Sequence, residues 1–203
     1  MRWCLLGYMM LSLLLLGCSD DDETIYPSLR TELADVKTGS DKTVTTLTFD
    51  DGRIYHADRQ IKSSSADTTL RCLCSYSIDD DNSAESFKVY SITIVPSSYP
   101  KPLSYFKGKR NSPVKLLSLW ESARYINAYI SYKTTDKGKH SFSFCEDKIE
   151  LNEDGRLTAF VSLFHERPSD DAESYTKRLY VSLPKYYYND KAEVVVLRVG
   201  NYE

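Results

Sequence analysis

The sequence predicts an all-β protein made of two domains. Apolar and polar residues alternate with a period of two along most of the chain after residue 30, and clusters of turn-forming residues separate the alternating segments. These segments are rich in β-branched and aromatic residues, and no long heptad, low-complexity block or internal repeat interrupts them. Pro96, Pro100 and Pro102 form a break that divides the strands into two groups.

The first group of strands predicts a small barrel. Asp51 and Gly52 lie between two alternating segments, and this pair favours a tight hairpin turn because glycine accepts a positive φ. Five short strands in about 65 residues suit an OB-like barrel, which we place at residues 31–97. The expected strands are residues 33–37, 43–49, 53–56, 69–78 and 87–95.

The second group predicts a sandwich. Residues 114–132 fit a helical face as well as they fit strands, but strict alternation follows at 140–144, 157–163 and 179–183. Residues 194–199 form a last apolar strand. We therefore expect an immunoglobulin-like antiparallel β-sandwich at residues 113–203, joined to the barrel by a proline-containing linker at 98–112.

The N-terminus predicts a signal peptide at residues 1–17. Arg2 precedes a continuous apolar run at residues 5–16, which is shorter than the roughly 20 residues that a transmembrane helix needs. A run of this length after a positive start is typical of a secretory signal.

The segment Leu15-Leu16-Gly17-Cys18 resembles the bacterial lipobox. The resemblance implies cleavage before Cys18, a diacylglycerol on its sulfur and an acyl chain on its new amine. Each buried methylene contributes about 0.8 kcal/mol, so these chains would make a durable membrane anchor. No other cofactor is expected.

An acidic run follows the anchor, made of Ser19, Asp20, Asp21, Asp22 and Glu23. It resembles the export signal of Bacteroidota lipoproteins, which implies surface exposure on the outer membrane, with the periplasmic face as the alternative. The same charges would keep residues 18–30 extended as a lipidated acidic tether.

The net charge excludes a protein held to nucleic acid by bulk charge. The chain has 26 basic and 29 acidic side chains, a net of −3 and a pI near 5.7. Arg2 is the one charged side chain that cleavage after residue 17 would remove, and the mature net charge would therefore be −4. Lys107, Lys109 and Arg110 form a small basic patch, either solvated or in contact with anionic lipopolysaccharide.

The cysteines and histidines predict neither a metal site nor a catalytic site. Cys72, Cys74 and Cys145 would remain in the mature chain, an odd number without CxxC spacing, and we interpret them as buried thiols. His56, His140 and His165 are separated in sequence, and no HExxH or GxSxG motif is present. The acidic clusters at 79–81, 146–147 and 170–171 lack EF-hand spacing and are expected to be solvated turn residues.

Tyrosine is the residue type whose abundance hints at a binding surface, since the chain has 16 copies. Tyr186, Tyr187 and Tyr188 precede a turn and are weak candidates for stacking on a sugar or a protein partner. The alternative is that they are ordinary tyrosines of a strand edge.

Several segments resemble the NigD-like lipoproteins of Bacteroidota. The C-terminal matches are Leu119-Trp120-Glu121-Ser122, Tyr125-Ile126-Asn127 and Lys139-His140-Ser141-Phe142, and the N-terminal match is Phe49-Asp50-Asp51-Gly52. The later segments Leu163-Phe164-His165, Asp170-Asp171 and Val181-Ser182-Leu183 extend the C-terminal match. The resemblance implies an OB-like domain followed by a β-sandwich. It also implies a link by name to bacteriocin loci, without an established biochemical activity.

We therefore expect a non-enzymatic, lipid-anchored binding or interaction module of the cell envelope, bacteriocin-associated or immunity-related. Its ligand would be a protein or a glycan rather than a nucleic acid. The alternatives are an envelope-acting hydrolase that uses a histidine with a serine or an acid, and a structural accessory subunit of an outer-membrane complex.

The lipobox predicts the outcome of one substitution. Cys18→Ala should leave an unprocessed precursor without acyl chains, because both reactions need the cysteine. Metabolic labelling with a fatty acid, followed by measurement of the precursor's mass, checks this. Continued acylation of the variant would contradict the assignment.

Overall fold

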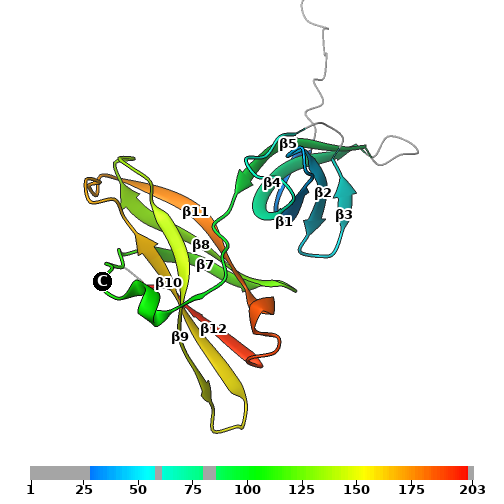
Figure 1. Cartoon of the computed structure of the whole chain (residues 1–203). Helices are drawn as coiled ribbons and strands as arrows, with labels where there is room; N and C mark the ends of the chain where they lie inside the picture. Colours follow the sequence, from blue (N-terminus) through cyan, green and yellow to red (C-terminus); the bar gives the residue numbers. More distant parts are fainter. Residues whose placement is uncertain (1–27, 58–60, 80–85, 201–203) are drawn as a thin grey trace, which may run out of the picture.

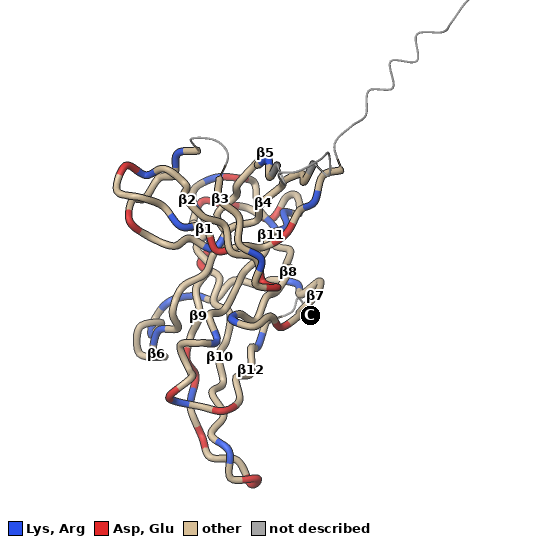
Figure 2. Tube along the Cα trace, turned by 90° about the vertical axis from the view of Figure 1, so that its right-hand side faces the viewer, with Lys and Arg blue, Asp and Glu red and all other residues tan. Residues whose placement is uncertain are grey.

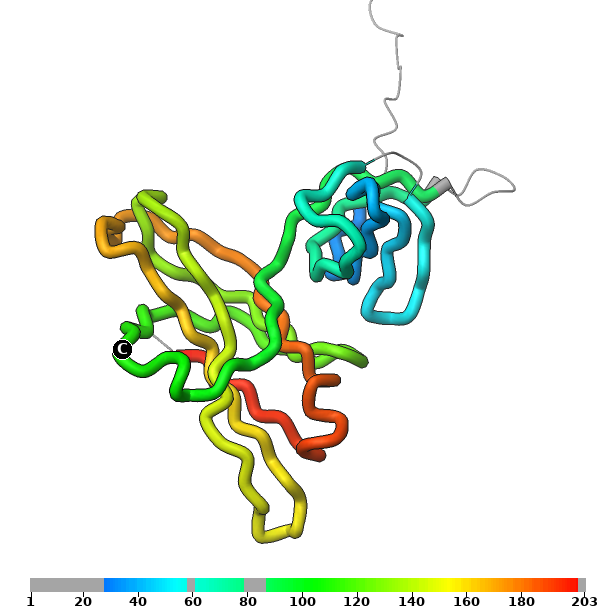
Figure 3. Tube along the Cα trace, in the orientation of Figure 1, coloured from blue at the N-terminus to red at the C-terminus, as the bar shows by residue number. Residues whose placement is uncertain are grey.

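The computed structural model describes residues 28–57, 61–79 and 86–200, and these form two β domains joined by one crossing of the chain (Figures 1 and 3). The all-β prediction is confirmed. The predicted signal peptide, Cys18 and the acidic run Ser19–Glu23 lie outside the described residues.

The N-terminal domain is a strongly curved five-stranded sheet with the order β3-β2-β1-β4-β5 (Figure 1). The strands are β1 (Arg30–Thr38), β2 (Val44–Phe49), β3 (Ile54–His56), β4 (Thr69–Asp79) and β5 (Ser86–Ile94). All neighbouring pairs are antiparallel. This is the strand order of an OB-like barrel opened between β3 and β5.

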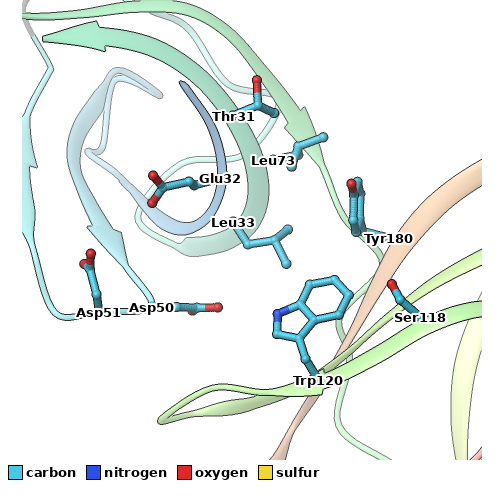
Figure 4. Close-up of a pocket in the computed structure, with 9 residues that line it drawn as sticks. All are labelled: Thr31, Glu32, Leu33, Asp50, Asp51, Leu73, Ser118, Trp120 and Tyr180. Atoms are coloured by element: carbon cyan, nitrogen blue, oxygen red, sulfur yellow. The ribbon is translucent and has the colours of Figure 1, made fainter. Parts of the chain in front are cut away.

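The turn between β2 and β3 forms as the sequence predicts. Gly52 has a φ of 90°, a conformation in which a side chain would be strained. The Phe49 amide donates to the Arg53 carbonyl at 2.9 Å, and the Arg53 amide donates to the Asp51 carboxylate at 3.0 Å. The hairpin places Asp50 and Asp51 at the end of the barrel that faces the second domain (Figure 4).

Aromatic packing supports the open side of the barrel. Tyr55 of β3 stacks on Phe87 of β5 with ring centroids 4.4 Å apart, and Phe87 also contacts the buried Tyr76. Cys72 and Cys74 are fully buried free thiols of this core, as predicted. Burial raises the pKa of each thiol to about 12, so both stay protonated and unreactive.

The C-terminal domain is a sandwich of two sheets (Figure 1). One sheet has the order β12-β10-β9-β6 and the other has the order β11-β8-β7. The strands are β6 (Lys101–Pro102), β7 (Lys115–Glu121), β8 (Tyr125–Thr134), β9 (Ser141–Leu151), β10 (Leu157–Glu166), β11 (Tyr175–Pro184) and β12 (Val194–Arg198). The segment 114–132, which also fitted a helix, forms β7 and most of β8.

Buried apolar side chains of both sheets fill the space between them. On β8 the core-facing residues are Ala128 and Ile130, and β10 and β11 contribute Val161 and Val181, all completely buried. Alternation along these strands matches the predicted pattern, because every second residue points inward. Among the described residues, no helix is long and apolar enough to cross a membrane.

Two features of the sandwich differ from the prediction. The expected sandwich is wholly antiparallel, but β6 runs parallel to β9 and β12 runs parallel to β10. The expected linker at 98–112 also contributes β6 and the 3₁₀ turn η2 (Leu103–Phe106) to the sandwich. Pro102 is tolerated because β6 lies at a sheet edge, where its missing N–H leaves no neighbour unpaired. Phe106 then packs on Phe164, with ring centroids 4.5 Å apart, and covers the free thiol of Cys145.

Candidate functional site

A buried arginine joins the barrel to the sandwich. Arg71 of β4 is only 4% exposed, and its guanidinium contacts two barrel carboxylates, Asp35 at 3.4 Å and Asp50 at 2.7 Å. The same group donates to Ser182 at 3.3 Å and Asn127 at 3.2 Å, two completely buried residues of the sandwich. Because a buried cation is costly without full hydrogen bonding, this arginine depends on both domains.

The sandwich in turn completes the environment of Asp35. The Tyr125 hydroxyl donates to Asp35 Oδ1 at 2.8 Å, and Arg124 donates to Oδ2 at 2.8 Å. The Arg71 guanidinium also lies over the Tyr125 ring, 4.1 Å from its centroid. Burial, followed by the Asp35 charge, raises the pKa of Tyr125 well above its usual range, so the hydroxyl remains a donor. We call Asp35, Asp50, Arg71, Arg124, Tyr125, Asn127 and Ser182 the interdomain bridge.

A cleft of about 400 Å³ opens beside the interdomain bridge (Figure 4). Ser118, Trp120 and Tyr180 of the sandwich line one side. The other side belongs to the barrel, with lining residues Thr31, Glu32, Leu33, Asp50, Asp51 and Leu73. Since both domains contribute, the width of this cleft is set by the bridge beneath it.

An aromatic row continues from the cleft along the sandwich. Tyr180 meets Trp120 edge to face at 6.0 Å and stacks on Tyr129 at 4.6 Å. Tyr129 and Tyr180 line a second cavity of about 500 Å³, which shares Leu73 and Tyr180 with the first. The two cavities therefore adjoin, and Trp120, Tyr180 and Tyr129 form one aromatic row facing the barrel.

Carboxylates lie on the barrel side of the cleft. Glu32 and Asp51 both pair with Arg53, at 2.7 and 2.5 Å. The Arg53 amide is the main reason that the pKa of Asp51 lies below its usual value. Aromatic faces, carboxylates and the Ser118 and Thr31 hydroxyls are groups that can stack on a ligand or form hydrogen bonds with it.

A histidine pair lies near the Thr134 end of the β8 strand, and His140 also lines the second cavity. His140 Nδ1 and His165 Nε2 are 2.8 Å apart, and His140 Nε2 lies 3.0 Å from Asp171 Oδ2. The two histidines appear isolated in sequence, yet the β9–β10 register brings them together. The third histidine, His56, is exposed on β3 of the barrel.

Two of the acidic clusters differ from the expectation. Glu146 and Asp147 lie within β9 and not in a turn, and they accept from the hydroxyls of Tyr188 and Ser162. Asp171 differs as well. It was expected to be a solvated turn residue, but it is 5% exposed and its Oδ1 accepts from the amides of Thr135 and Lys137. Burial raises its pKa, but these hydrogen bonds and those from the hydroxyls of Thr135 and Thr134 outweigh that effect and hold the pKa well below its usual range. The neighbouring Asp170 is exposed, as predicted.

The hydrogen bonds assign the tautomers of the pair. An ionised Asp171 can only accept, so the neutral His140 ring carries its proton on Nε2 and accepts on Nδ1. His165 Nε2–H must then be the donor to His140. Burial, with a further contribution from His140, lowers the pKa of His165 to about 4. This row of hydrogen bonds ties together three segments of the sandwich.

The predicted tyrosines lie in the 3₁₀ turn η3 (Lys185–Tyr188). Tyr188 is buried, and its hydroxyl donates to Glu146 at 2.9 Å. Tyr186 and Tyr187 are half-buried against Tyr99, and cations lie over both rings, Arg124 over Tyr186 and Lys191 over Tyr187. Their part in binding stays a prediction. Within the described ranges, no group of three or more His, Cys, Asp or Glu residues is placed to hold a metal ion.

Sequence reasoning missed both the bridge and the aromatic row. Trp120 was noted only as part of a family-like segment, and Arg71 was not singled out. One signal was available: Asn127 and Tyr129 alternate with the core residues of β8, which places them together on its other face. The partners from the barrel could not be found in this way, since nothing local specifies them.

Comparison with solved structures supports the predicted resemblance. The chain is similar to a NigD-like immunity protein from Bacteroides caccae, with 26% identity, a TM-score of 0.70, and coverage of 88% of this chain and 89% of that chain. A protein of unknown function from Bacteroides vulgatus shares the fold, at 15% identity and a TM-score of 0.62, with coverage of 86% and 85%. The resemblance to NigD-like proteins is thus confirmed. No protein-family model matches the sequence, and no curated protein sequence does.

The interdomain bridge predicts that Arg71→Ala strongly lowers the free energy of unfolding. Removing the guanidinium leaves two carboxylates facing each other at the junction, and breaking a buried pair of this kind costs about 3–5 kcal/mol. Urea unfolding of the mature chain measures the change in the free energy of unfolding. Arg156→Ala, which removes an exposed arginine paired with Asp154, is the control and should have a far smaller effect. Equal effects would contradict the role of the bridge.

The histidine pair predicts a pH dependence of stability. His165 binds a proton less readily in the folded protein than in the unfolded chain. Its contribution to the free energy of unfolding is therefore complete above pH 6.5 and is lost as the pH falls towards 4. The free energy of unfolding should decrease across this window by at most about 1.4 kcal/mol per pH unit. His165→Phe should flatten this slope, whereas His56→Gln should not. A slope that survives in His165→Phe would assign the titration to another group.

Proposed function

We propose that this protein is a non-enzymatic, lipid-anchored binding module of the cell envelope, which holds a protein or glycan ligand in its interdomain cleft. The observation that carries the proposal is the aromatic row of Trp120, Tyr180 and Tyr129. These rings stand on one sheet of the sandwich, face the barrel, and border cavities of about 400 and 500 Å³. Large aromatic side chains that stay accessible beside a cavity are typical of binding sites.

The rigidity of the cleft supports this proposal. The bridge fixes the barrel against the sandwich through hydrogen bonds between buried groups, so the two walls are held in place before a ligand arrives. A preformed site loses less conformational entropy on binding, which favours affinity.

The similarity to an immunity protein supports a more specific version. We propose an immunity-related or bacteriocin-associated role, in which the cleft binds a protein toxin or the glycan that the toxin recognises. The 26% identity and the coverage of nearly the whole of both chains are the support for this. The competing hypothesis, a structural accessory subunit of an outer-membrane complex, predicts different captured partners.

The proposed location rests on sequence features before residue 28. We propose that acyl chains on Cys18 anchor the protein in the outer membrane, and that the run Ser19–Glu23 directs it to the cell surface. The lipobox-like segment and the abrupt change from apolar to acidic residues support this.

The aromatic row predicts that Trp120→Ala weakens ligand capture. Immobilised mature chain should retain a specific glycan or a secreted protein from envelope and culture fractions, and loss of a central aromatic should reduce retention about thirty-fold, the effect of a 2 kcal/mol hot spot. Tyr90→Ala is the matched control, because Tyr90 is 42% exposed on the barrel while Trp120 is 36% exposed.

Direct binding can then be followed through the same residue. Trp3 belongs to the predicted signal peptide, so Trp120 is the single tryptophan of the predicted mature chain, and its fluorescence reports on the cleft. Equal capture by wild type and Trp120→Ala would contradict the cleft as the site. Recovery of membrane-complex subunits alone would favour the accessory-subunit hypothesis.

A further inference from the structure

A basic segment connects the barrel to the sandwich. Residues 97–120 contain five Lys or Arg residues and no Asp or Glu, although the chain as a whole is net acidic. The basic residues are Lys101, Lys107, Lys109, Arg110 and Lys115. Figure 2 shows basic positions at the turn beside β6.

Apolar side chains project from the same turn. Leu103 is 59% exposed and Tyr105 is 47% exposed, while Phe106 between the turn and the sheet is buried. The buried Phe106 ring holds η2 on the sandwich through its contact with Phe164. Leu103 and Phe106 also border an open depression of about 360 Å³. The exposed leucine is therefore held in place and is not a side chain of a loose loop.

Cations surround the exposed tyrosine. Lys101 Nζ lies 4.0 Å and Lys109 Nζ lies 4.4 Å from the centroid of the Tyr105 ring. Lys101, followed by Lys109, lowers the pKa of Tyr105. The carboxylate of Glu166 lies 3.5 Å from Lys109 Nζ and pairs with it. Lys107 and Arg110 are exposed beside it.

We propose that this turn, made of Lys101, Leu103, Tyr105, Lys107, Lys109 and Arg110, docks on an anionic lipid surface. Its chemistry matches the boundary of a bilayer, where cations meet lipid phosphates, a tyrosine sits at headgroup level and a leucine enters the acyl region. The surface is separate from the cleft, so this inference does not depend on the proposed ligand.

The length of the tether favours a membrane as the occupant. Residues 18–28 can span at most about 35–40 Å when fully extended. A protein anchored at Cys18 therefore keeps its domains at a high effective concentration next to the bilayer, where even a weak contact is occupied. The contact would fix which way the cleft faces, since the turn belongs to the sandwich that carries the aromatic row.

The test is co-sedimentation of the unacylated mature chain with vesicles. Phosphatidylcholine vesicles containing phosphatidylglycerol should retain the chain, and pure phosphatidylcholine vesicles should not. Each Lys or Arg near an anionic surface contributes about 1 kcal/mol, roughly a five-fold change in partitioning. The triple variant Lys107→Gln/Lys109→Gln/Arg110→Gln should therefore partition about a hundred-fold less.

A charge-matched control separates this surface from bulk charge. Arg30→Gln/Lys37→Gln/Lys42→Gln removes one exposed arginine and two exposed lysines from the barrel, and it should change partitioning far less. Leu103→Ser leaves the charge unchanged and should weaken partitioning several-fold, because it removes the apolar contact. Thermal unfolding of each variant checks that the fold is retained.

Three outcomes would overturn the proposal. Equal binding to both kinds of vesicle would show that binding does not need an anionic headgroup. Equal loss of binding in the two triple variants would show that binding depends only on the net charge of the protein. Release by inorganic phosphate at constant ionic strength, with Leu103→Ser behaving as wild type, would indicate a site for a free anion and not for a lipid surface.

Discussion

The burial of Arg71 is the constraint on which the arrangement of the two domains depends. A guanidinium has five N–H donors and no acceptor, so a fully buried one needs partners on several sides. The barrel supplies Asp35 and Asp50, and the sandwich supplies Asn127 and Ser182. The bridge is neutral because its two carboxylates are matched by two guanidinium groups, those of Arg71 and Arg124. The barrel supplies both carboxylates and Arg71, and the sandwich supplies Arg124, so the charges are matched only when the two domains are together.

Such a bridge selects one orientation more strongly than an apolar contact would. An apolar surface loses little energy when it slides, whereas buried charges lose their partners as soon as the domains shift by an ångström or two. The orientation in turn defines the cleft, because Leu33 and Leu73 face Trp120 and Tyr180 only in this arrangement (Figure 4). Strands β8 and β11 therefore each contribute to two parts of the structure. Their inward residues belong to the core, and their outward residues contribute to the bridge and the aromatic row.

Local signals in the sequence were sufficient for the strands but not for the contacts between distant segments. The five barrel strands, the Gly52 turn and the buried thiols were predicted correctly, because alternation and turn chemistry are properties of neighbouring residues. The bridge joins residues up to 111 positions apart, as in the contact of Arg71 with Ser182, and no spacing in the sequence indicates it. His140 and His165 became neighbours only through the register of β9 and β10.

Asp171 shows why a cluster of acids is ambiguous before the fold is known. Asp170 and Asp171 are adjacent and chemically identical, yet one is exposed and the other is buried among backbone amides of the loop after β8. The amides of Thr135 and Lys137 would lack an acceptor without that carboxylate, so the loop and the acid stabilise each other. The same reasoning applies to Asp50 and Asp51 of the β2–β3 turn. Asp50 points into the bridge towards Arg71, and Asp51 stays with Arg53 at the wall of the cleft. In both pairs, the direction of each side chain decides which partners the acid meets, and adjacent acids therefore have different roles in the fold.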